Sequence, residues 1–329
     1  MSGLSRRDLL RVGAGVGAGV AVGSLGTALF GLGRGTGPRA PVEPGRAESY
    51  GHGVEPPAGL DAAALDPALL PPPSRVPGAA TGASAELWVS EQPVAVARDA
   101  TLAAWTFNGR IPGPILRATE GDELAIRFRN LGARPHNLHL HGRHDVGQDG
   151  WQPVPPGGER IYRVRAEPYG LHPYHCDATP AAEHLSHGLY GMLIVDPPRG
   201  RPPAHEVALV LSGFDLDGDG RNELYGWNGV AGGFERYPIK VPAGALVRVY
   251  LLNMVADDPV ASFHLHAETF DLYRSGTRLV PDERTDVVTM GQTERAIVEF
   301  RLPRRGRYMF HPHQRHMAER GGMGWFAAV

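Results

Sequence analysis

The sequence of 329 residues contains a single cysteine, Cys176, and this scarcity excludes an internal disulfide. The 33 basic and 35 acidic residues nearly balance, so the charge predicts no nucleic-acid partner and no strongly acidic face. Only seven methionines are present and they do not cluster, which argues against a methionine-rich site for cuprous ions. With 42% hydrophobic residues, the chain is typical of a globular protein long enough for two domains.

The amino terminus carries an export pattern. Ser5-Arg6-Arg7-Asp8-Leu9-Leu10 precedes an apolar stretch rich in glycine and alanine, from about Val12 to Leu32, and this order resembles a twin-arginine signal. The stretch is weakly hydrophobic, so a transmembrane helix is the second interpretation, and an uncleaved anchor stays open. We therefore expect residues 1–40 to be a signal segment and the protein to be periplasmic, at the cell surface or extracellular.

The remaining chain predicts an all-β protein with two domains. Residues 41–84 are dense in proline, glycine and alanine without a period, which indicates a linker or arm. Short apolar runs then alternate with Gly/Pro turns, and this spacing favours β-sandwiches. These runs are Leu87–Val89, Leu124–Phe128, Ile161–Val164, Met192–Val195, Val207–Leu211, Ile239–Val241, Val247–Leu252, Ala296–Phe300 and Tyr308–Phe310. Pro197 to Pro203 separates the two sets, so we expect domains at 85–198 and 204–329.

Fifteen histidines are present, and six of them form three His-x-His pairs. On a strand, residues i and i+2 point to the same face, so each pair can address neighbouring metals. Both halves contain an early His-x-His pair and, later, a segment that runs from a glycine through a tyrosine to a histidine, Gly170–His175 and Gly306–His311. This repeat indicates an internal duplication. The pairs are His139-Leu140-His141, His264-Leu265-His266 and His311-Pro312-His313.

The lone cysteine has imidazole neighbours at the spacing of a metal site. His175 precedes Cys176, His184 follows it by eight residues, and His136 lies about forty residues upstream. One thiolate with two imidazoles and a weak or absent fourth ligand suits a blue-copper electron-transfer centre, whereas zinc would require four full ligands. A buried inert thiol is the alternative, and three correctly ordered partners disfavour it.

Together these motifs resemble those of the multicopper oxidases, in particular the short kind with two domains. The resemblance covers nearly everything after Ala85. It implies an all-β fold with two tandem cupredoxin-type Greek-key β-sandwich domains. The residues that carry it are Phe107-Asn108-Gly109-Arg110-Ile111-Pro112-Gly113-Pro114, Glu120-Gly121-Asp122, His136–Gly142, Pro155-Pro156-Gly157-Gly158, Tyr174-His175-Cys176, His184, Phe263–His266 and Phe310–His313.

The resemblance implies four coppers per chain, of types 1, 2 and 3. Type-1 copper would be held by His136, Cys176 and His184, and type-2 copper by His139 and His264. The type-3 pair would be held by His141, His175, His266, His311 and His313. The axial position of type-1 copper would fall on Leu189, which cannot ligate, so the resemblance implies a three-coordinate centre of high potential. Met192 is predicted to be ordinary core.

Asp177 departs from the family pattern, which has histidine on both sides of the cysteine. Three interpretations stay open: the carboxylate ligates copper, a spare histidine such as His316 or His187 takes its place, or one copper is absent or labile. The related copper nitrite reductases also lack histidine here. They carry an aspartate where this chain has His139, and they lack the paired histidines of the second half.

The resemblance implies an exported oxidase. It would couple one-electron oxidation of a donor at type-1 copper to four-electron reduction of dioxygen to water at a trinuclear cluster. The donor could be a phenol, an aryl amine, a metal ion or a small redox protein, and a homotrimer is expected because cluster ligands of neighbouring chains meet. The alternatives are a nitrite-reductase-like enzyme with one type-1 and one type-2 copper, or a non-catalytic copper-binding electron-transfer protein.

Two acidic motifs each have two interpretations. Asp149, in Gln148-Asp149-Gly150, matches the position of a proton-relaying acidic residue in related oxidases, and it also suits an ordinary turn. Asp215-Leu216-Asp217-Gly218-Asp219-Gly220 resembles the start of a calcium loop. Because Gly226 stands where such a loop has glutamate, we predict a solvated turn there instead.

Overall fold

The computed structural model describes residues 53–60, 65 and 85–329. The predicted signal segment lies outside the described residues, as does most of the predicted linker. Within that linker, Leu65 is 3% exposed and packs into the hydrophobic core of the second domain, and the backbone amide of Arg98 donates to the Glu55 carbonyl. The described residues of this segment therefore contact both domains, and its role as a linker or an arm stays a prediction. Over the same residues, no helix combines the length and the apolarity needed to cross a membrane.

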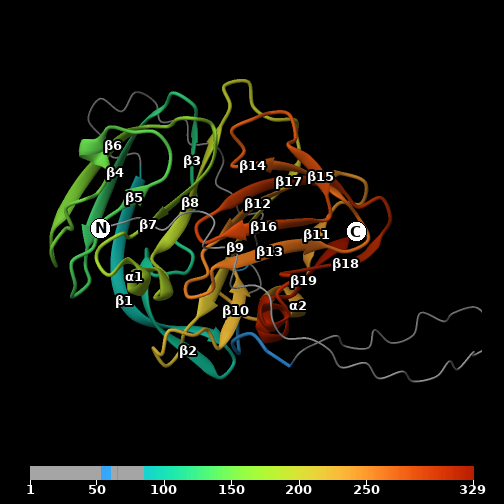
Figure 1. The fold of residues 1–329 in the computed structure, drawn as a ribbon, viewed down its shortest axis with the longest axis horizontal. Coiled ribbons are helices and arrows are strands. Elements are labelled where there is room, and N and C mark those ends of the chain that lie inside the picture. The colour runs from blue at the N-terminus through green and yellow to red at the C-terminus, as the bar shows by residue number, and fades with distance from the viewer. Residues whose placement is uncertain (1–52, 61–64, 66–84) are drawn as a thin grey trace, which may run out of the picture. The chain divides into compact units, whose positions relative to one another are not determined.

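The first domain consists of two four-stranded sheets, drawn from cyan to yellow-green in Figure 1. In sheet order, the first contains β2 (Ala100–Phe107), β1 (Ala85–Ala97), β4 (Glu123–Asn130) and β6 (Glu159–Arg165). The second contains β3 (Leu116–Thr119), β8 (Tyr190–Asp196), β7 (Gly170–His175) and β5 (His139–Leu140). A short 3-10 helix, η3 (Val146–Gln148), and one helical turn and a half, α1 (Ala181–Ser186), lie in its loops.

The second domain consists of a six-stranded and a five-stranded sheet. In sheet order, the larger contains β10 (Leu224–Trp227), β9 (His205–Phe214), β12 (Leu246–Asn253), β17 (Arg295–Arg301), β14 (Phe270–Arg274) and β15 (Glu283–Thr285). The smaller contains β11 (Ile239–Val241), β19 (Gly324–Ala328), β18 (Gly306–His311), β13 (Val260–Leu265) and β16 (Val287–Gly291). Its short helices are α2 (Gly233–Arg236), α3 (Arg315–Met317) and η4 (Ala318–Gly322).

The two domains repeat one topology. The order β2-β1-β4-β6 recurs as β10-β9-β12-β17, and β3-β8-β7-β5 recurs as β11-β19-β18-β13. Strand directions agree as well, since β1 and β4 pair in parallel as β9 and β12 do, and β5 and β7 pair antiparallel as β13 and β18 do. The predicted all-β fold and the internal duplication are confirmed.

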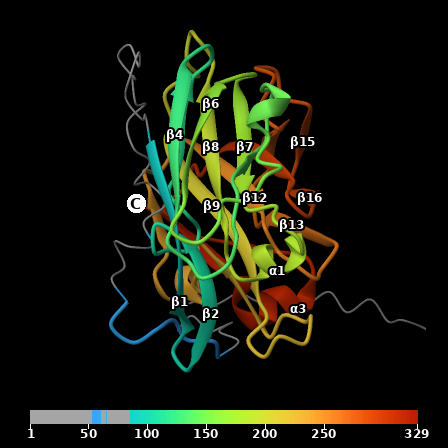
Figure 2. The same cartoon turned by 90° about the vertical axis from the view of Figure 1, so that its left-hand side faces the viewer.

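The central strands are buried on both faces, which explains their continuous apolar runs. In β9, Val207 and Leu209 pack inside the second sandwich, whereas Ala208 and Val210 join a separate cluster with residues of the first domain. In β8, Met192 belongs to that same cluster. Figure 2 shows β8 and β9 running next to each other near the centre of the molecule. A third hydrophobic core thus lies between the domains.

An ion network spans the connection between the domains. The Arg117 guanidinium contacts Asp196 at the end of β8 and Glu206 at the start of β9, each at 2.7 Å. No strand covers the residues from 197 to 204, where the sequence places its boundary. The domain limits 85–198 and 204–329 stay a prediction.

Candidate metal centre

The first ligand group joins three buried side chains of the first domain. His136, Cys176 and His184 are each at most 4% exposed. The Cys176 Sγ lies 3.1 Å from His184 Nδ1 and 3.8 Å from His136 Nδ1, and the two Nδ1 atoms are 3.1 Å apart. His136 precedes β5, Cys176 follows β7, and α1 turns His184 back toward both. The donor set of one sulfur and two imidazole nitrogens fits type-1 copper.

Burial sets the protonation of this group. It lowers the pKa of His184 to about 4, with a further contribution from neighbouring His136, so the imidazole is neutral at physiological pH. It also raises the pKa of the Cys176 thiol to about 11. A cation must therefore displace the thiol proton on binding, which couples metal uptake to proton release.

Asn137 holds the cysteine loop in place. Its backbone amide lies 3.4 Å from Cys176 Sγ, its Oδ1 accepts from the Asp177 amide at 2.6 Å, and its Nδ2 donates to the Gly150 carbonyl at 2.9 Å. The amide contact reduces the negative charge on a bound thiolate. One side chain thus ties the cysteine loop to the turn that carries Asp149.

The structure also locates the two candidates for the axial position. Leu189 is fully buried in the same core cluster as Cys176, and its carbonyl accepts from the Cys176 amide at 3.0 Å. Met192 is fully buried in the cluster between the domains. Met192 is therefore core, as predicted.

A second ligand group contains His139, His141 and His175. His139 on β5 pairs directly across from His175 on β7, and His141 follows His139 on the same face, with ring centroids 5.1 Å apart. The Nε2 atoms of His141 and His175 are 3.1 Å apart. Burial, followed by the neighbouring imidazoles of His175 and His139, lowers the pKa of His141 to about 3. The His141 ring is therefore neutral at physiological pH and can act as a metal ligand.

Contacts at Nδ1 orient two rings of this group, those of His175 and His139. His175 Nδ1 donates to the Cys176 carbonyl at 3.0 Å, and His139 Nδ1 lies 2.9 Å from Asp149 Oδ1. The same Asp149 oxygen lies 3.0 Å from His144 Nε2. Gly150 permits this turn, because a side chain there would collide with the Leu138 carbonyl. Asp149 is thus a partner of His139 rather than a turn residue alone.

The second domain repeats the arrangement. His264 on β13 pairs across from His311 on β18, and His266 Nε2 lies 2.9 Å from His311 Nε2. His311 Nδ1 donates to the Pro312 carbonyl at 2.7 Å, and His264 Nδ1 donates to the Asp286 carbonyl at 2.8 Å. His264, His266 and His311 form a third ligand group, separate from the first two. His313 stands beside it, with its ring centroid 4.9 Å from that of His264.

The duplication assigns a counterpart to Asp177. His175 corresponds to His311, since each is the cross-strand partner of the first histidine of its half. Two residues on, Asp177 corresponds to His313. Both side chains are exposed and both stand outside the tight group of three imidazoles. Asp177 therefore occupies the place of a fourth imidazole, and its charge acts on His175.

The two spare histidines have other partners. His187 stacks on Trp105, with centroids 4.2 Å apart, and its Nδ1 donates to the Glu183 carbonyl. His316 Nε2 lies 3.4 Å from Asp258 Oδ1, and its ring packs against Tyr225. Neither joins a ligand group among the described residues.

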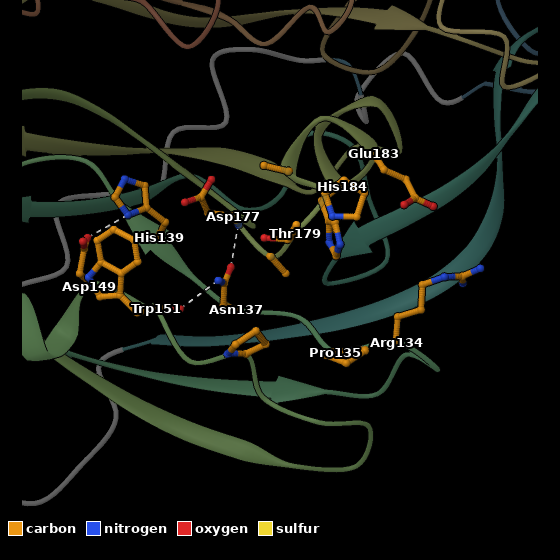
Figure 3. A pocket seen from close by; sticks show the side chains of 15 residues that line it. Arg134, Pro135, Asn137, His139, Asp149, Trp151, Asp177, Thr179, Glu183 and His184 are labelled. Atoms are coloured by element: carbon orange, nitrogen blue, oxygen red, sulfur yellow. Dashed lines mark hydrogen bonds and ion pairs between the residues drawn. The ribbon is translucent and has the colours of Figure 1, made fainter.

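A cavity of about 660 Å³ connects the two sites of the first domain. Figure 3 shows His184 and Glu183 at one side of it and His139, Asp149 and Asp177 at the other. Trp151, 72% exposed, lies beside Asp149. The cavity gives small molecules access to the His139 end.

The acidic motif of the second domain also folds into a compact loop. Asp215, Asp217, Asp219 and Glu223 each bring a carboxylate oxygen within 4.8 Å of the others. Asp215 accepts from the backbone amides of Gly218 and Gly220, as an acidic turn does without any ion. Glu223 is a member that the sequence reading did not include.

Comparisons with known proteins decide the family. Residues 89–200 and residues 201–329 each match the description "Multicopper oxidase". The chain belongs to the multicopper oxidase family. A solved structure described as a multicopper oxidase is 42% identical with a TM-score of 0.73, covering 74% of this chain and 88% of that one. The fold of this multicopper oxidase is therefore the cupredoxin-type pair predicted above.

Curated relatives include enzymes of two activities. The copper-containing nitrite reductase of Neisseria meningitidis serogroup A is 30% identical over 246 residues, covering 67% of this chain and 62% of that protein. Laccase-2 of Botryotinia fuckeliana is 34% identical over 128 residues, covering 36% of this chain and 22% of that protein. The match thus spans about three fifths of the Neisseria enzyme. Membership of the family implies copper.

Sequence reasoning gave no role to three residues near these sites. Asn137 lies just before the His139-Leu140-His141 motif and His144 just after it, and their contacts with Cys176 and Asp149 depend on how the loop folds back. Trp105, whose ring packs edge-on against His136 and His184, lies on another strand and had no local signal.

Proposed function

We propose that this multicopper oxidase is an exported enzyme that oxidises a reducing donor and reduces dioxygen to water. When bound, copper supplies this chemistry, with one-electron oxidation at the type-1 site and four-electron reduction of dioxygen at a trinuclear cluster. The observation that carries the proposal is the repeated imidazole group, His139, His141 and His175 in one domain and His264, His266 and His311 in the other. A single catalytic copper would not require both groups.

The chain's own residues have distinct tasks in this proposal. Cys176 and His175 are neighbours in sequence but belong to different ligand groups, so one peptide unit connects the two sites as an electron path. Asp149 holds the His139 ring through Nδ1 and is in turn held by His144, which orients the free Nε2. From this position Asp149 can also pass protons toward the dioxygen-reducing site.

A homotrimer is proposed because the two halves of the cluster are separate within one chain. Each half offers free Nε2 atoms at an open position: His139 lines the large cavity, and His264 and His266 line another of about 470 Å³. Head-to-tail contacts that close into a ring bring the first half of one chain to the second half of the next. Export through the twin-arginine route, to the periplasm, cell surface or exterior, is part of the same proposal.

The proposal is tested by the copper content of the purified, copper-loaded protein. We expect close to four coppers per chain and dioxygen uptake with a phenolic donor, because the ligand groups provide one type-1 site and one trinuclear cluster per chain. Two coppers per chain together with nitrite turnover would favour the nitrite-reductase-like alternative. Copper binding with neither activity would indicate an electron-transfer protein.

Replacement of Asp177 tests its membership of the cluster. Asp177→Ala removes the counterpart of His313, so we expect one copper to be held loosely and dioxygen reduction to fall about 10–100-fold. The blue type-1 colour should persist, since His136, Cys176 and His184 are untouched. Copper per chain, dioxygen uptake and the visible spectrum measure these effects.

Asp177→His is the matched variant, since it restores the residue type that the second half carries. Imidazole suits copper better than a carboxylate, so copper retention and dioxygen reduction should equal or exceed those of the wild type. Unchanged copper stoichiometry and turnover in Asp177→Ala would remove Asp177 from the cluster.

A further inference from the structure

One ring nitrogen at the type-1 site has no hydrogen-bond partner. His136 is fully buried, and its Nδ1 belongs to the ligand group with Cys176 and His184. Its Nε2 is buried and makes no hydrogen bond. Leaving a buried N–H unpaired is costly, and the second nitrogen of a metal-binding imidazole is usually held by a carboxylate or carbonyl. The surroundings of His136 Nε2 therefore bear on the properties of the site.

A charged group, Glu91 on β1, lies beside that nitrogen. Its Oε1 lies 3.6 Å from His136 Nε2, so the contact is an electrostatic one rather than a full hydrogen bond. The carboxylate reaches the copper site from a strand 45 residues away in sequence, and its side chain is only 19% exposed. Poor access to water limits the screening of its charge.

Three other contacts fix the Glu91 carboxylate in this place. Oε1 accepts from the backbone amides of Ala133 and Arg134, at 2.8 and 3.1 Å, and Oε2 accepts from the Arg134 guanidinium at 2.7 Å. The two amides and the Arg134 guanidinium thus hold both oxygens of the carboxylate, and the ion pair with Arg134 keeps it charged. The group beside His136 is thus an ordered anion.

The positive charge that faces the Glu91 carboxylate belongs to the Arg134 side chain. The Arg134 guanidinium lies over the Trp105 ring, 4.7 Å from its centroid, and its side chain is 52% exposed. Trp105 packs edge-on against both copper-binding imidazoles. Arg134 is more exposed than Glu91, at 52% against 19% of the side chain, so water screens its charge more strongly than that of the carboxylate.

We propose that Glu91 is a positioning residue of the type-1 site, which orients His136 through Nε2 and favours the oxidised, more highly charged state of the bound copper. A negative charge close to a ligand ring stabilises a dication more than a monocation. Glu91 therefore lowers the reduction potential of the bound copper. This effect opposes that of the apolar Leu189, which favours a high potential. The inference rests on the copper site proposed above.

The test is the reduction potential of type-1 copper in Glu91→Gln. Glutamine keeps the shape and the amide-accepting oxygen but removes the charge. We expect the equilibrium between the oxidised and reduced states to move about tenfold toward the reduced state, the size of one charge-assisted interaction. For a one-electron couple this is a rise of about 59 mV. The position of the blue absorption band should stay unchanged, because the ligand atoms are the same.

The matched control is Glu86→Gln on the same strand. Glu86 is also paired with an arginine, Arg129, at 3.2 Å, but both side chains are over 40% exposed. A potential shift in Glu91→Gln no larger than that in Glu86→Gln would overturn the inference. If Glu91→Gln does not fold, Glu91→Asp is measured instead, with Glu86→Asp as its control. Shortening the side chain by one methylene moves the carboxylate away from His136, so the reduction potential should rise in Glu91→Asp. An unchanged potential in Glu91→Asp would overturn the inference.

The measurement separates this inference from the proposed function. A spectroelectrochemical titration of the blue band needs neither dioxygen nor nitrite turnover. A wild-type protein that binds no blue copper would contradict the proposed function. A blue protein whose reduction potential is the same in Glu91→Gln as in the wild type would contradict the role of Glu91. It would leave the proposed function intact.

Discussion

We expect Cys176→Ser to abolish the blue colour and the oxidation of every donor together. The thiolate would be the soft ligand of the proposed type-1 site, and a serine hydroxyl is a poor ligand for Cu(I). The side chain is fully buried, and a serine hydroxyl can donate to Asn137 Oδ1 as the thiol does, so the protein should still fold. Visible absorption, copper content and dioxygen uptake with a phenolic donor measure the effect. The coppers of the trinuclear cluster should be retained, because their imidazoles are untouched.

Met192→Leu is the control for this variant. Met192 is fully buried between the domains and apart from the Cys176 cluster, so its replacement by an apolar side chain of similar volume should leave both colour and turnover in place. Loss of the blue band in Met192→Leu would make Met192 a ligand. Retained donor oxidation in Cys176→Ser would mean that electrons enter by another route.

Two inactive variants should restore activity when they assemble together. His141→Ala destroys the first half of the cluster and His311→Ala destroys the second, so each alone should lack dioxygen reduction. If neighbouring chains share each cluster in a closed ring of three, every mixed trimer contains one site built from two intact halves. Co-expression with two different tags and purification through both should therefore yield about one third of the wild-type turnover per trimer.

The matched control combines two defects in the same half. His141→Ala mixed with His175→Ala leaves no intact first half in any chain, so these trimers should stay inactive. Cluster assembly within one chain predicts no recovery from either mixture. Equal recovery from both mixtures would show that the assay does not report the shared site.

The sequence predicts much of the fold, for reasons that the strands make clear. Each of the nine apolar runs lies within a strand, because strands such as β9 are buried on both faces and need continuous apolar residues. The sequence also predicts that the two histidines of each His-x-His pair point the same way, since residues i and i+2 share a face of a strand. Short strands and α1 were missed, because six residues are too few for a helical period.

The candidate site was predicted less completely, because its outer contacts depend on register and loop path. The spacing of His136, Cys176 and His184 is a local signal, and the structure brings these three side chains together. The contact of Glu91 with His136 joins two strands that only the folded sheet brings close. The shared carboxylate of Asp149 depends likewise on a turn at Gly150 that folds back over Leu138.

The hydrophobic core between the domains has a consequence for how this protein could evolve. In β8 and β9, one face of each strand lines the core of its own sandwich. The opposite faces meet between the domains, with Met192 and Ile194 on β8 and Ala208 and Val210 on β9. Separating the domains would expose both apolar sheets to water, at a cost that a single small sandwich could not recover. The shared core thus ties the two copies of the repeat together, while the metal ligands of each copy can still differ, as residue 177 differs from residue 313.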